Sequence, residues 1–154
     1  MAGASIAFTY AASDTSGRVR NPFVAVWVED SASKMVGLVS VLFSVGDAQY
    51  LRELTEYSAV ASNANAAEID AVTGATRSAG QFQLHWDGKG LDGSVLSGNY
   101  NVWIEAVREH GPHSVMNGAS HSGRPPPTRY EDGGGSTAYI AMTAIRHASG
   151  ERTL

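Results

Sequence analysis

Alternating hydrophobic and polar residues mark several short segments of the chain. Ile6, Phe8 and Tyr10 alternate with small or polar residues, and the same period of two recurs over residues 81–86. This spacing predicts β-strands with one buried face. Runs of β-branched and aromatic residues predict further strands over 22–29, 35–45, 99–108 and 138–145. The long apolar run at 35–45 predicts a strand that is buried on both faces.

Helical spacing is confined to one segment. Residues 50–57 place their apolar side chains on one side of a helix. Residues 58–67, rich in Ala, Ser and Asn, predict a surface loop or a frayed helix end, and residues 111–136, rich in Gly, Pro and Ser, predict a long mobile connection. We therefore expect an all-β fold, in which residues 1–154 form one β-sandwich domain with one short helix and long Gly/Pro-rich loops.

Composition narrows the classes of function. The 154 residues include no Cys, which excludes disulfides, thiol nucleophiles and thiolate metal sites. A formal net charge of −4 and the absence of a basic run argue against a nucleic-acid partner. No segment approaches ~18 consecutive apolar residues, so we expect no direct membrane insertion. The sequence shows no export leader, so we expect either a cytosolic protein or a mature chain whose leader is absent here.

A turn-rich segment begins at Trp86. The sequence Trp86-Asp87-Gly88, followed by Gly93 and by Gly98-Asn99-Tyr100, resembles the hairpin of flagellar-hook-cap-type immunoglobulin-like domains. The resemblance implies that Trp86 fills the core and that Tyr100 starts the return strand. The resemblance supports an immunoglobulin-like β-sandwich and indicates no function.

Candidate chemistry lies just before this turn, in the segment Asp70-Ala71-Val72-Thr73-Gly74-Ala75-Thr76-Arg77-Ser78. It resembles the D-x-x-[S/T]-G-A-[T/S]-x-[S/T] acceptor motif of extracytosolic flavin-carrying proteins, such as subunits of ion-pumping redox complexes. In those families a flavin transferase, using FAD and Mg²⁺, links the phosphate of FMN to the hydroxyl of the last motif Thr. The resemblance implies that Thr76 is the acceptor in this chain.

The other motif residues suit a loop that presents this hydroxyl. We expect the segment 68–80 to be a loop in which Gly74 and Ala75 leave room for the flavin donor and Asp70 orients the turn. Thr73 or Ser78 could hydrogen-bond the phosphate. The alternative is an ordinary surface turn without a cofactor.

Two arginines could supply positive charge. Arg77 lies next to the expected acceptor, where it could bind the phosphate. Arg108, at the end of the strand 99–108, could reach the phosphate or the pyrimidine edge of the flavin if that strand pairs with 81–86. A strand-end ion pair is the alternative for Arg108.

Four segments together resemble the DUF2271 family of predicted periplasmic proteins. They are residues 20–30, 70–76, 86–88 and 104–111, and the resemblance spans roughly residues 5–148. The family is found near flavin transferases and membrane-bound redox proteins. The resemblance implies a periplasmic protein that carries covalent FMN on Thr76 and moves electrons between membrane and periplasmic redox partners, acting as a redox carrier more than as a stand-alone enzyme.

Two other classes of function remain open from the residues. The first is a cofactor-free immunoglobulin-like interaction module in the periplasm. The second is a protein that handles a metal or haem through His110, His113 and His121, although Pro112 prevents a helix from aligning these side chains.

Overall fold

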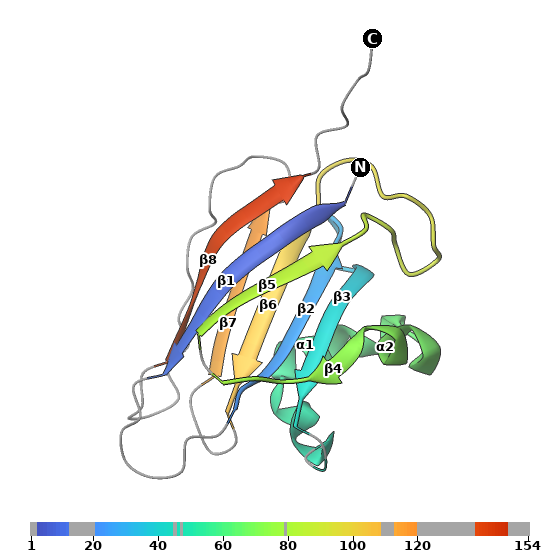
Figure 1. Ribbon diagram of the computed structural model, residues 1–154. Coiled ribbons are helices and arrows are strands. Elements are labelled where there is room, and N and C mark those ends of the chain that lie inside the picture. The colour runs from blue at the N-terminus through green and yellow to red at the C-terminus, as the bar shows by residue number, and fades with distance from the viewer. Residues whose placement is uncertain are drawn as a thin grey trace.

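Two β-sheets pack face to face in this computed structural model, and a helical layer covers the outer face of the larger sheet (Figure 1). The structure describes residues 3–12, 21–44, 46, 48–78, 80–108, 113–119 and 138–147. The strands are β1 (Ala4–Ala12), β2 (Phe23–Glu29), β3 (Met35–Phe43), β4 (Thr73–Ala75), β5 (Gly80–Trp86), β6 (Asn101–Val107), β7 (His113–Ala119) and β8 (Ala138–His147). The predicted all-β sandwich is confirmed.

The smaller sheet has the strand order β5-β1-β8 and the larger sheet the order β4-β3-β2-β6-β7. All neighbouring strands are antiparallel except β3 and β4, which run parallel. The predicted hairpin after Trp86 is wrong, because β5 pairs with β1 whereas β6 pairs with β2 and β7. The intervening segment therefore crosses from one sheet to the other, although Trp86 is buried as expected.

The segment between β3 and β4 is more helical than the sequence predicts. It contains the 3₁₀ helix η1 (Ala48–Glu53), α1 (Thr55–Val60), the 3₁₀ helix η2 (Ala61–Asn63) and α2 (Ala66–Val72). The expected single helix at 50–57 is split at Leu54. Of the two alternatives for 58–67, the helix end describes residues 58–63, where α1 and η2 finish, and the loop is limited to the short connection before α2. The Asn65 side chain accepts a hydrogen bond from the Glu68 amide, while the Glu68 carboxylate accepts one from the Asn65 amide. This capping box starts α2.

Every residue of β2 is buried. Val24, Val26 and Val28 face the core between the sheets, whereas Phe23 and Trp27 face the core beneath the helices. Two-sided burial follows from the three-layer arrangement, since each face of the larger sheet is covered by another layer. The run at 35–45 follows the prediction, because most residues of β3 are also buried.

Strand β7 lies inside the segment that the sequence predicts as a mobile connection. Residues 113–119 pair with β6 in antiparallel register, so that part of the prediction is wrong. The remainder of 111–136 lies outside the described residues.

Candidate functional site

The acceptor-like motif lies across the end of α2 and strand β4 (Figure 1), so the expected loop is wrong for residues 68–75, whereas residues 76–78 belong to no helix or strand. Thr73 ends the helix: its amide donates to the Asp70 carbonyl, and its hydroxyl donates to the Ile69 carbonyl at 2.7 Å. Asp70 is exposed on the last turn of α2, where its carboxylate makes no hydrogen bond or ion pair with any residue that the structure describes. The Thr73 hydroxyl is thus committed to the helix end, and Asp70 sits on a helix instead of orienting a turn.

Strand β4 brings the motif to an edge of the larger sheet. Thr73, Gly74 and Ala75 pair in parallel register with the last residues of β3, and no other described strand pairs with β4. A methyl group added at Gly74 would meet only the Leu42 side chain, at an ordinary contact distance of 3.5 Å. The fold therefore does not require glycine at this position.

Thr76 lies at the seam where the chain leaves one sheet for the other. Its amide donates to the Phe43 carbonyl at 3.1 Å, and its hydroxyl donates to the Pro22 carbonyl at 2.5 Å. The residue is half-buried. The hydroxyl is consequently held in one orientation without being enclosed in the core.

Arg77 and Ser78 follow on the surface, and both are exposed. The Arg77 guanidinium donates to the Gln81 carbonyl at 2.6 Å, and its central carbon lies 4.5 Å from the centroid of the Phe82 ring. A depression of about 290 Å³ opens beside this side chain. It is lined by Ala7, Phe8, Arg77, Gln81, Phe82 and Gln83.

Arg108 lies at the same end of the sandwich as Thr76, but through a strand pairing that the sequence does not predict. The strand that precedes it, β6, pairs with β2, and Val107 lies opposite Phe23. Continued by one residue, this register sets Arg108 opposite Pro22, the residue that accepts the Thr76 hydrogen bond. Arg108 is only 6% exposed, so its side chain belongs to the interior of this end.

Tyr10 is buried beside Arg108. Burial raises the pKa of Tyr10 to about 12, and the positive charge of Arg108 acts in the opposite direction. The Tyr10 hydroxyl has no hydrogen-bond partner among the described residues. Tyr10 pairs with Gly80 on β5, and Gly80 follows Thr76 by four residues along the chain.

The histidine candidates do not form a described metal site. His113 lies on β7, and its Nε2 is 2.5 Å from Oε1 of Glu105. His110 and His121 lie outside the described residues. Within the described part of the chain, no group of three or more His, Cys, Asp or Glu side chains could hold a metal ion.

Glu105 is a functional-looking residue that sequence reasoning missed. It is fully buried on β6, and its carboxylate accepts hydrogen bonds from the backbone amides of Glu56 and Tyr57 at the start of α1. The available signal was one acidic residue inside an otherwise apolar strand. Its contacts anchor the helical layer to the sheet, which is a structural role.

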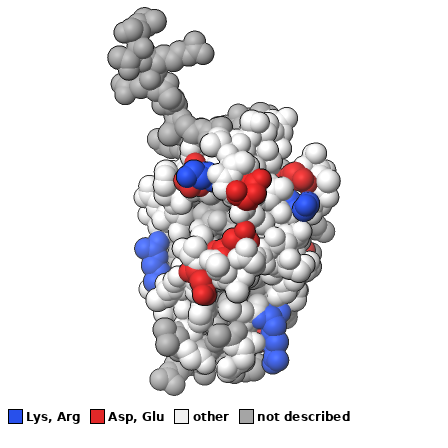
Figure 2. Space-filling model, turned by 90° about the vertical axis from the view of Figure 1, so that its right-hand side faces the viewer, with Lys and Arg blue, Asp and Glu red and all other residues white. Residues whose placement is uncertain are grey.

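The face that carries the helices and β4 is mainly acidic. Figure 2 shows Asp and Glu side chains across the middle of this side of the molecule, with Lys and Arg toward its margins. The helical segment 48–72 contributes Glu53, Glu56, Glu68 and Asp70 against a single cation, Arg52. A partner that approaches β4 from this side meets negative charge.

The fold and site define a β-sandwich that presents a half-buried threonine at the seam between its sheets. The family described as "Predicted periplasmic protein (DUF2271)" matches residues 6–120, and the chain belongs to this family. Membership confirms the expected periplasmic location. No curated protein and no solved structure matches the chain, so the immunoglobulin-like relationship stays a prediction. Among the described helices, none is long and apolar enough to cross a membrane.

Proposed function

We propose that this periplasmic protein carries FMN in phosphoester linkage to Thr76 and transfers electrons outside the cytosol. A flavin transferase installs the group, and a membrane or periplasmic redox protein exchanges electrons with it. The observation that carries the proposal is the position of the Thr76 hydroxyl, which is half-buried next to an edge strand and follows the motif residues Thr73-Gly74-Ala75.

The attachment step balances with FAD as the donor. The Thr76 oxygen attacks the phosphorus on the riboflavin side of the pyrophosphate, a new P–O bond forms, and the bond to AMP breaks. AMP leaves with the electron pair, and the hydroxyl proton is lost to a base of the transferase. Because this hydroxyl donates to the Pro22 carbonyl in the resting fold, the step also removes that hydrogen bond. The Thr76 side chain must therefore turn away from Pro22 to react.

Other residues around Thr76 suit a tethered phosphate and flavin. Arg77 provides an exposed cation directly beside the linkage, and Ser78 provides an exposed hydroxyl. Gly74 and Ala75 leave the approach along β4 free of bulky side chains, and the fold itself does not need the glycine. When bound, the flavin supplies one- and two-electron chemistry, while the protein determines its position and its electrostatic surroundings.

Intact mass tests the proposal directly. The chain is produced together with its flavin transferase, and the mass of the purified protein is compared with that of the bare chain. We expect an increase equal to FMN less one water. Thr76→Ala should lose this increase completely, whereas Thr76→Ser, which keeps a hydroxyl, should retain it.

Thr73→Ala is the matched control, because it removes a motif hydroxyl that is already committed to the Ile69 carbonyl. It should still gain the FMN mass. An increase that persists in Thr76→Ala would show that the acceptor is a different residue. A wild-type chain that gains no mass would contradict covalent FMN altogether.

A further inference from the structure

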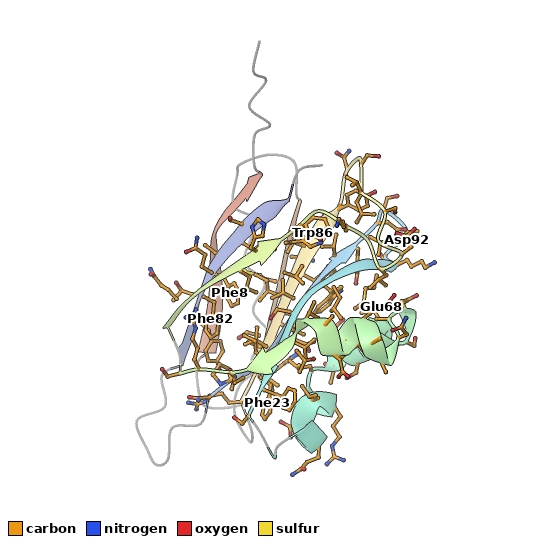
Figure 3. The ribbon with its side chains drawn as sticks, turned by 45° about the vertical axis from the view of Figure 1, so that its right-hand side comes forward. Phe8, Phe23, Glu68, Phe82, Trp86 and Asp92 are labelled. Atoms are coloured by element: carbon orange, nitrogen blue, oxygen red, sulfur yellow. The ribbon has the colours of Figure 1, made fainter. Side chains whose placement is uncertain are left out.

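Three side chains form a stack at the open edge of the smaller sheet. Phe8 on β1 and Phe82 on β5 are parallel to within 4°, with ring centroids 5.1 Å apart. Figure 3 shows these two residues side by side. The Arg77 guanidinium lies over Phe82 and is fixed by its hydrogen bond to the Gln81 carbonyl. Arg77 therefore covers Phe82, and both phenylalanines are 1% exposed.

The guanidinium itself is not covered in the same way. The guanidinium carbon lies over the Phe82 ring, yet Arg77 as a residue is exposed, so part of its side chain remains accessible to a further planar group. A guanidinium is planar and delocalised, and it stacks on aromatic faces by cation–π attraction. The stack can thus be extended outward by one more ring.

The surroundings of this face are polar. The depression of about 290 Å³ beside Arg77 is bordered by Gln81 and Gln83, whose side chains are exposed on the outer surface of β5. Each amide offers both a donor and an acceptor. The pyrimidine edge of a flavin likewise alternates donors and acceptors, so the two surfaces are complementary in chemistry.

We infer that this depression is the seat of the isoalloxazine ring, which stacks on the outer face of Arg77 with its pyrimidine edge toward Gln81 and Gln83. The inference rests on the proposed attachment of FMN to Thr76. Since Arg77 directly follows Thr76, the depression begins beside the tether, and the ribityl chain bridges the two. Arg77 thereby acts mainly on the ring, whereas the sequence suggests that it binds the phosphate.

The seat has an electrostatic consequence. A positive charge against the ring favours the form of the flavin that has taken up electrons, because that form carries more negative charge. Arg77 should therefore raise the midpoint potential of the bound flavin. A stacked ring held in one orientation should also show an induced circular dichroism signal in the visible region.

The test uses the flavin-loaded chain and the variant Arg77→Gln, with Arg52→Gln as the matched control. Arg52 is also an exposed cation, but it belongs to η1 in the helical layer. We expect Arg77→Gln to keep the FMN mass, to shift the midpoint potential to more negative values and to lose the visible circular dichroism. Arg52→Gln should leave both signals unchanged.

Gln83→Tyr provides a second variant outside the acceptor motif. Its larger side chain fills the depression, so the visible circular dichroism should be lost while the FMN mass remains. Loaded Arg77→Gln and Gln83→Tyr proteins with unchanged potential and circular dichroism would overturn the ring seat alone. Absence of any FMN mass in the wild-type chain would overturn the attachment itself, and the seat with it.

Discussion

Glu105 shows how one buried charge can hold two layers together. Its carboxylate is fully buried and accepts hydrogen bonds from two backbone amides of α1, at 3.1 and 2.7 Å. His113 supplies a third polar contact from the neighbouring strand. A buried carboxylate is costly unless its oxygens are satisfied, and here they are satisfied by groups that themselves need partners.

Glu105→Ala should therefore destabilise the fold strongly. It would leave the amides of Glu56 and Tyr57 without their acceptor, the second of them in a buried region, and it would remove the carboxylate that contacts His113, so we expect a loss of about 3–5 kcal/mol in the free energy of unfolding. Urea denaturation followed by tryptophan fluorescence measures this loss. Glu56→Gln alters an exposed carboxylate on the same helix turn and should change stability by less than about 0.5 kcal/mol. Equal effects of the two substitutions would contradict the anchoring role.

At the scale of elements, Gly74 on β4 distinguishes the requirements of folding from those of recognition by the flavin transferase. Gly74 has no close backbone neighbour and no positive φ, so alanine fits there. We expect Gly74→Ala to leave the free energy of unfolding unchanged or to raise it by about 0.4–1 kcal/mol, because the unfolded chain loses freedom. The same substitution should slow loading by the flavin transferase, measured as FMN mass against time.

The matched comparison is Gly90→Ala. A methyl group there would lie 2.9 Å from the Leu96 side chain and 3.0 Å from the Val36 carbonyl oxygen. This variant should lose stability but load normally once folded. If Gly74→Ala loads as fast as the wild type, the glycine of the motif has no part in recognition by the transferase.

The elements also show which parts of the structure the sequence could reveal. The alternating segments at 6–10 and 81–86 became β1 and β5, because one face of each strand packs in the core and the other does not. Helix α2 was missed because Ser and Asn residues precede it and because its last residues belong to the acceptor-like motif, which suggested a loop, although the Asn65–Glu68 capping box was readable. Strand β7 was missed because glycine, proline and polar residues surround its short apolar core.

For the candidate site, the sequence indicates Thr76 as the acceptor but does not predict which residues contact it in the fold. The pairing of β6 with β2 instead of β5 depends on contacts between distant residues, which no local pattern encodes. The same limit applies to the stacking of Arg77 on Phe82 and to the hydrogen bond from Thr76 to Pro22. The Thr73 hydroxyl looked free only because the end of α2 was not foreseen.

On the scale of the whole molecule, the last described strand completes the smaller sheet. Strand β8 pairs with β1 from Ala4 to Ala12, and it lies outside the residues 6–120 that define the family match. Without β8, the smaller sheet would keep only β1 and β5, and the backbone of β1 would lose its partner along one edge. Sheets of two strands are marginal in water, and free strand edges promote aggregation.

A chain shortened to residues 1–137 should therefore lose cooperative unfolding and aggregate. A chain of residues 1–147, which keeps β8, is the matched control and should unfold as the full chain does. Thermal unfolding by circular dichroism and size-exclusion chromatography measure both properties. A monomeric 1–137 chain with an unchanged melting temperature would contradict the importance of β8.

The loop between β5 and β6 shields an edge of the larger sheet, at the start of β3. The Leu91 amide donates to the Val36 carbonyl at 2.8 Å, so the loop covers the half of β3 that the short β4 does not reach. Figure 1 shows this long excursion beyond the start of β3. Its many turn residues thus protect a strand edge as well as connecting the two sheets.

The position of Thr76 makes this residue a natural reporter of sheet separation. It is bonded to Pro22 at the entry to one sheet, while its neighbour Arg77 caps the other. Any parting of the sheets at this end must break one of these contacts before either sheet unravels. Hydrogen exchange of the Thr76 amide, which donates to the Phe43 carbonyl, would therefore report opening at this end without any change to the side chain.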